Sequence, residues 1–202
     1  MTELLLLALL AQNFEQRGFI EDRTLVYPQD ASNDSGNFVD QAWFRWEASY
    51  KASPWLKLNG TFDARADTHQ QADRELRLNL DDRTTRRPAL SVRQLSATIH
   101  KDKVTAELGR QLIRWGKTDI LTPTDRFAPR DYLSSVVDSD FLGVTAARVT
   151  VAGASNSLDV VWQPWFTPSR TPLLNQRWTV LPPELSAIAV TDAGAQYPGR
   201  GQ

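Results

Sequence analysis

The sequence predicts an all-β fold, an antiparallel up-and-down transmembrane β-barrel, of which this chain supplies about seven strands. After Gly18, apolar and polar residues alternate with period two over most of the chain, which is typical of strands with one dry and one wet face. The expected strands are about 9–13 residues long, close to the length that crosses a bilayer at a tilt. Their connections alternate between short and long, as in a barrel with tight turns on one rim.

Seven segments carry this alternation. In the second segment, Phe44 lies on the apolar face, and Arg45 and Glu47 lie on the polar face. In the third, Asp63 and Arg65 lie on the polar face. The expected strands are Gly18–Tyr27, Phe38–Tyr50, Trp55–Ala66, Ser91–His100, Val104–Leu112, Phe141–Val151 and Leu158–Phe166.

The expected connections distinguish two rims. Residues 51–54, 101–102 and 153–156 form short connections, whereas 28–37, 67–89, 113–140 and the stretch from 167 onward are long. This order favours a membrane barrel with short turns on one side and extended loops on the other. The alternation by itself also fits a soluble β-sandwich, since both folds have one dry and one wet face.

Aromatic residues gather near the ends of the expected strands. The chain contains seven Trp although its mean hydropathy is −0.41. Trp46 and Tyr50 lie beside one short turn, Trp55 follows it, and Trp162 and Trp165 close the last strand. Such rings are stable at the headgroup level of a membrane. The alternative is that they fill the core of a sandwich.

Composition excludes several classes of function. The net charge is −1, which argues against a polybasic nucleic-acid binder. The chain has no Cys and two His, so thiol catalysis and Cys- or His-rich metal sites are excluded. No nucleophile elbow or phosphate-binding loop occurs. We therefore expect no catalytic residue, no metal and no cofactor.

The first eleven residues resemble a secretory signal. Residues 4–10 are apolar throughout and too few to cross a membrane as a helix. Cleavage after Ala11 is expected, and residues 12–202 then form the N-terminal part of a barrel. Glu3 stands where a signal usually has Lys or Arg, so an ordinary helical leader is the alternative.

One unusual string follows the fifth expected strand. It runs Gly109-Arg110-Gln111-Leu112-Ile113-Arg114-Trp115-Gly116-Lys117-Thr118-Asp119, followed by Pro123-Thr124-Asp125 and Pro129-Arg130-Asp131. This resembles a signature of uncharacterised porin-like outer-membrane β-barrels of Gram-negative bacteria, most closely over residues 104–133. The resemblance implies an outer-membrane channel without catalytic residues, in contact with lipid and lipopolysaccharide and passing small solutes. Such barrels have an even and larger number of strands than this chain provides.

The 113–139 loop is a candidate constriction of that channel. Asp119, Asp125 and Asp131 recur every six residues, and basic residues are interleaved with them. Opposed carboxylates and guanidinium groups would select solutes in a narrow pore. The alternative is a surface loop in which Pro-x-Asp units form turns. The expected pore-lining residues are Arg45, Glu47, Asp63, Arg65, Arg114, Lys117, Asp119, Asp125, Arg126, Arg130 and Asp131.

Two other functions compete with a passive channel. A secreted soluble β-sandwich could bind carbohydrate by stacking sugars on Trp43, Trp115 or Trp165. An outer-membrane enzyme could use His100 as a base.

Overall fold

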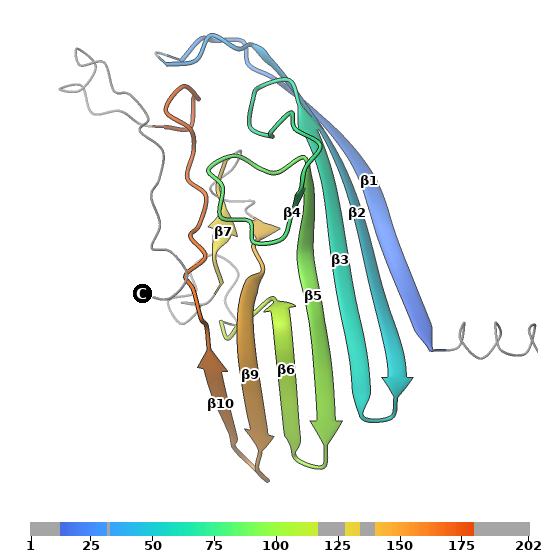
Figure 1. The fold of residues 1–202 in the computed structure, drawn as a ribbon. Coiled ribbons are helices and arrows are strands. Elements are labelled where there is room, and N and C mark those ends of the chain that lie inside the picture. Colours follow the sequence, from blue (N-terminus) through green and yellow to red (C-terminus); the bar gives the residue numbers. More distant parts are fainter. Residues whose placement is uncertain (1–12, 32, 117–127, 134–139, 180–202) are drawn as a thin grey trace, which may run out of the picture.

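Antiparallel strands make up most of the structure, a computed structural model that describes residues 13–31, 33–116, 128–133 and 140–179 (Figure 1). Seven long strands follow one another along the chain, and no helix occurs among the described residues. The predicted all-β antiparallel class is therefore confirmed, whereas the expected leader, residues 1–11, lies outside the described part. The long strands are β1 (Phe14–Val26), β2 (Phe38–Ser53), β3 (Leu56–Asp67), β5 (Leu90–Lys101), β6 (Val104–Gln111), β9 (Val144–Ala152) and β10 (Ser157–Trp162).

The long strands form a meander in the order β1-β2-β3-β5-β6-β9-β10. Turns of two to four residues join β2 to β3, β5 to β6 and β9 to β10, and all three lie at the lower end of the sheet in Figure 1. The long connections leave the opposite end. The alternation of short and long connections expected from the sequence is thus present between these strands.

The described strands form an open sheet. On this path β1 pairs only with β2, and β10 pairs only with β9. The closed barrel predicted from the sequence is therefore not present in the part of the chain that the structure describes. Each neighbouring pair along the path is antiparallel. Because the path contains seven strands, β1 and β10 run in the same direction.

The two faces of the sheet have opposite chemistry. Large apolar side chains on one face are exposed, with Leu158 at 63%, Val160 at 56% and Trp162 at 66% on β10 alone. On the other face, Asp63 is 1% exposed and Arg93 is 3% exposed. Soluble proteins usually show the reverse, with charges outside and apolar side chains inside.

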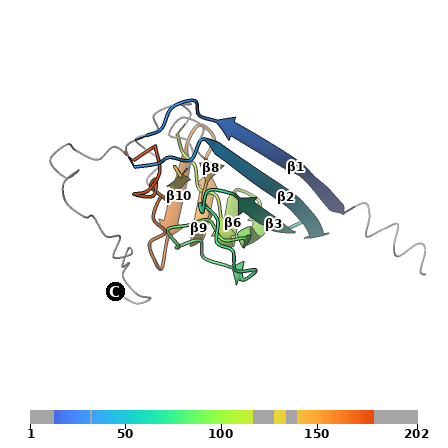
Figure 2. The same cartoon turned by 90° about the horizontal axis from the view of Figure 1, so that it is seen from above.

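Short segments cover the polar face near its loop end. They include β4 (Leu78–Asn79), β7 (Arg130–Asp131) and β8 (Asp140–Phe141). β4 pairs with β5, the only parallel pairing of strands among the described residues, and β7 pairs with β8. Figure 2 shows the sheet curving around these segments. The cluster of buried apolar residues is small, comprising Ile113, Val144 and Ala146 with Val161 packed against it.

Two backbone irregularities bring arginines to the polar face. The pairing of β3 with β5 shifts by one residue at Arg93, so that both Ser91 and Ser96 are buried although they differ in parity. In β6, Gly109 has a φ of +112°, and a Cβ there would lie 2.4 Å from the carbonyl oxygen of Leu95. Arg110 follows this glycine and is buried on the polar face, where simple alternation would place it on the apolar face.

Candidate functional site

Ten buried or half-buried charged side chains meet on the polar face, and we call them the arginine–aspartate network. The network contains six guanidinium groups and four carboxylates from the wall strands and from the segments folded against them. Its members are Arg45, Arg65, Arg87, Arg93, Arg110, Arg170, Asp63, Asp82, Asp131 and Asp140.

One half of the network surrounds Asp63 and Asp140. Arg45 donates to both Asp63 oxygens at 2.7 Å and to Asp140 at 2.8 Å. Arg93 lies 2.6 Å from Asp140 and 3.6 Å from Asp63. Arg65 reaches the same two carboxylates at 3.3 and 3.1 Å. Three strands of the wall are thereby joined to β8.

The other half surrounds Asp82 and Asp131. Arg87 donates to the two Asp131 oxygens at 2.8 and 3.0 Å. Arg170 lies 2.9 Å from Asp82 and 3.4 Å from Asp131. Arg110 on β6 donates to Asp82 at 2.9 Å and to the carbonyl oxygens of Leu80 and Arg93. Asp82 and Asp131 thus have two arginine partners each, which offsets part of the penalty of burying their charges.

Two aspartates of the network lie on short strands inside the sheet and have lowered pKa values. Burial alone would raise the pKa of Asp131, but the adjacent Arg87 and Arg170 outweigh it and hold the pKa well below its usual range. The pKa of Asp140 is lowered likewise, by Arg93 and Arg45 against the effect of burial. Both side chains therefore carry a negative charge at neutral pH.

Aromatic rings orient several of these guanidinium groups. The Arg65 guanidinium lies 3.8 Å from the centroid of the Trp43 ring, and that of Arg45 lies 4.5 Å from it. Arg114 and Arg130 each lie 4.2 Å from the ring centroid of Phe141. Stacking of this kind fixes the guanidinium plane while leaving its N–H edge available.

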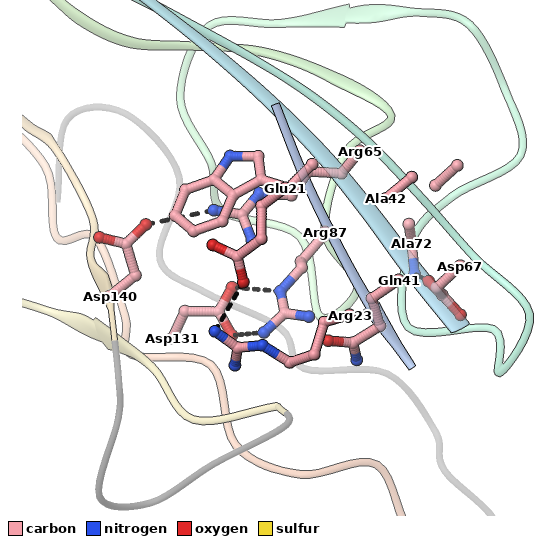
Figure 3. Close-up of a pocket in the computed structure, with 12 residues that line it drawn as sticks. Glu21, Arg23, Gln41, Ala42, Arg65, Asp67, Ala72, Arg87, Asp131 and Asp140 are labelled. Atoms are coloured by element: carbon pink, nitrogen blue, oxygen red, sulfur yellow. Dashed lines mark hydrogen bonds and ion pairs between the residues drawn. The ribbon is translucent and has the colours of Figure 1, made fainter. Parts of the chain in front are cut away.

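A cavity of about 390 Å³ opens beside the network (Figure 3). Arg65, Arg87, Asp131 and Asp140 point toward one another across it in this view, and the Trp43 ring also lines it. The volume lies within the range of pockets that hold small molecules. The cavity is polar and is bounded by charges of both signs.

The structure brings four of the expected pore-lining residues together: Arg45, Asp63, Arg65 and Asp131 belong to the network. Glu47 lies elsewhere on the polar face and pairs with Arg17 of β1. Arg114 and Arg130 lie over Phe141, and Lys117, Asp119, Asp125 and Arg126 lie outside the described residues. Of the 113–139 loop, residues 113–116 and 128–133 are described, and the latter stretch contributes Asp131 to the network.

Sequence reasoning missed several members of the network. Arg93 interrupts the alternation of its strand, and that interruption was the available signal of a bulge. Asp140 lies on the two-residue strand β8 and Arg170 forms an isolated bridge with Asp131, and both segments are too short to show a periodicity.

The string from Gly109 to Trp115 has a structural explanation. Gly109 permits the turn that directs Arg110 inward, and Gln111 is fully buried, donating to the carbonyl oxygen of Ala146 at 3.0 Å. The Trp115 indole donates to Asp159 of β10 at 2.9 Å, and Asp159 also pairs with Arg148 of β9. The string thus links β6 to the strands that follow it in the sheet.

The described residues contain no group of three His or acidic side chains placed to hold a metal ion. Within the same part of the chain, no helix has the length and apolar character needed to cross a membrane. No protein-family model, curated protein or solved structure matches this chain.

Proposed function

We propose that this chain forms part of the wall of an outer-membrane β-barrel channel that passes small hydrophilic solutes. The observation that carries the proposal is the inverted distribution of side chains. Apolar residues of the long strands are exposed on one face, and charged residues gather on the other. Lipid tails would cover the first face and water would fill the space bounded by the second, as in membrane barrels.

The alternative of a soluble sandwich would need a second sheet on the apolar face. The second sheet among the described residues is the two-residue pair β7 and β8, and its Asp131 and Asp140 belong to the charged network. An apolar face left open over seven strands would be an aggregation hazard in water. The pattern therefore favours lipid, with lipopolysaccharide on the loop side, as the partner of this face.

Closure of the proposed barrel needs further strands. Unpaired sheet edges are not tolerated in lipid, and β1 and β10 are both edges here. Since these strands run in the same direction, joining them directly would give a parallel pair. An odd number of further strands between β10 and β1 keeps every pair antiparallel. A second copy of this seven-stranded sheet, placed with its short turns on the same side, would again give parallel junctions.

The network supplies a candidate constriction. Asp140 contacts the polar face of the wall through Arg45 and Arg93, and Asp131 pairs with Arg87 of the loop that precedes β5. The segments that carry Asp131 and Asp140 therefore reduce the width of the proposed pore at a place lined by both positive and negative side chains. The width of a pore and the charges around it select the solutes that pass.

Fractionation and conductance test this proposal. The full-length gene product, expressed in a Gram-negative host, is expected in the outer-membrane fraction and should require detergent for extraction. Reconstituted in a planar bilayer, it should give discrete conductance steps. A folded product in the soluble periplasm would overturn the proposal. A membrane-bound protein that conducts no ions would exclude a channel and favour an outer-membrane enzyme.

A further inference from the structure

Arg65 is the surplus cation of the network. Asp63 and Asp140 already pair with Arg45 and Arg93. Arg65 reaches both carboxylates through a single nitrogen, Nη2, at 3.3 and 3.1 Å, and its Nε and Nη1 make no hydrogen bond within the described residues. Removing Arg65 would therefore leave both aspartates paired.

The network as a whole also has excess positive charge. Its six guanidinium groups face four carboxylates, which leaves two positive charges uncompensated within the network. Arg87 belongs to the other half of the network and lines the same cavity as Arg65. The charged residues that line the cavity are three arginines and four acidic residues, so an anion would bind there only at N–H donors that these carboxylates leave open.

The remaining acidic residues of the cavity already have partners. Asp67 accepts the backbone N–H groups of His69, Gln71 and Ala72. Glu21 pairs with Arg23 at 2.7 Å. These carboxylates therefore compete little for the Nε–H and Nη1–H groups of Arg65, whose guanidinium plane is fixed by the Trp43 ring at 3.8 Å.

We infer that the cavity beside Arg65 binds the carboxylate group of a small anionic solute during its passage. Both two-donor edges of a guanidinium include Nη2, which Asp63 and Asp140 already occupy in Arg65, so the solute carboxylate would accept a charge-assisted hydrogen bond from Nε or Nη1. The volume of about 390 Å³ accommodates a small organic acid but not a polymer. This inference rests on the proposed channel function and specifies its solute class.

Block of ion current by a dicarboxylate tests the site. Succinate is added to the reconstituted protein in potassium chloride, and the concentration that halves the chloride-carrying current is measured. We expect wild type to be anion-selective and blocked by succinate. Arg65→Gln should raise the half-blocking concentration about tenfold or more, because a charge-assisted hydrogen bond is lost. Arg65→Lys, which keeps the charge but replaces the oriented guanidinium N–H groups by a flexible ammonium, should give a smaller increase.

Lys57→Gln is the matched control. Lys57 lies on the polar face of the same strand, lines a separate pocket and loses the same charge. We expect it to change the half-blocking concentration by less than about twofold. Unheated gel migration reports folding of each variant; if Arg65→Gln does not fold, the comparison of Arg65→Lys with wild type decides.

The possible failures are distinguishable. Conductance without succinate block, or equal block in wild type and the folded Arg65 variants, overturns the carboxylate site and leaves the channel standing. Absence of conductance from the folded wild type overturns the channel, and the inference with it.

Discussion

Replacing Asp131 by asparagine removes the anion at the centre of one half of the network. Asp131 is buried, accepts two hydrogen bonds from Arg87, pairs with Arg170 and accepts the N–H of Leu133 at 3.1 Å. Asp131→Asn keeps the size of the side chain but leaves Arg87 without this carboxylate. Arg170 retains Asp82 at 2.9 Å.

The expected cost follows from these contacts. Removing one partner of a buried ion pair destabilises a protein by about 3–5 kcal/mol. The asparagine oxygen can still accept one of the former hydrogen bonds, so we expect the lower end, about 3 kcal/mol. Glu75→Gln is the control, because Glu75 is exposed in the same loop as Arg87 and should change stability by less than about 0.5 kcal/mol.

Urea unfolding in detergent micelles, followed by tryptophan fluorescence, measures both variants. The double variant Asp131→Asn/Arg87→Gln should lose less stability than the sum of the single variants, since the orphaned guanidinium is removed as well. An Asp131→Asn variant as stable as Glu75→Gln would refute the assignment of Asp131 as a buried, paired anion.

Three further predictions concern the wall and the charges of the network. Leu58→Arg should cost about 2–4 kcal/mol of stability in the membrane, because residue 58 lies on the face that meets lipid, whereas Asn59→Arg should cost much less. The yield of the heat-resistant folded band on a gel measures assembly of each variant. Equal yields from the two variants would contradict the face assignment. The free energy of unfolding should fall as pH drops below about 4. The pKa of Asp131 is lower in the folded state than in the unfolded state, so its ionised form stabilises the fold above the unfolded-state pKa, and this stabilisation is lost as pH falls through the folded-state pKa. Equal urea midpoints at pH 6 and pH 3 would count against this prediction. The chain has no cysteine, so pairs of cysteines can be introduced to test which strands are neighbours. The pair Val149→Cys/Val160→Cys should form a disulfide between β9 and β10, whereas the pair Ile20→Cys/Val160→Cys should not. A disulfide in the second variant, within one copy or between copies, would mean that β1 and β10 meet directly.

Period-two alternation predicted the long strands because each has one apolar and one polar face. Six of the seven expected strands begin within three residues of the observed start, and the first begins earlier, at Phe14, where it pairs with Tyr50 of β2. The last strand ends at Trp162, short of the expected Phe166. Pro164 follows closely, and proline cannot donate a ladder hydrogen bond.

The network could be predicted only in part, because its members come from two kinds of backbone. Arg45, Asp63 and Arg65 lie on regular strands, so alternation placed them on the polar face. Arg93 and Arg110 reach that face through a register shift and a left-handed glycine, which reverse the parity of their strands. Arg170 is brought in by a long-range contact with β7, which no local pattern encodes.

Nitroxide labels scanned along residues 56–60 of β3 test the central claim most directly. We expect collisions with dissolved oxygen at Leu56, Leu58 and Gly60, and collisions with an aqueous nickel chelate at Lys57 and Asn59. Labels on the apolar face that respond to the aqueous chelate as strongly as their neighbours would show that this face meets water, and the channel assignment would fail.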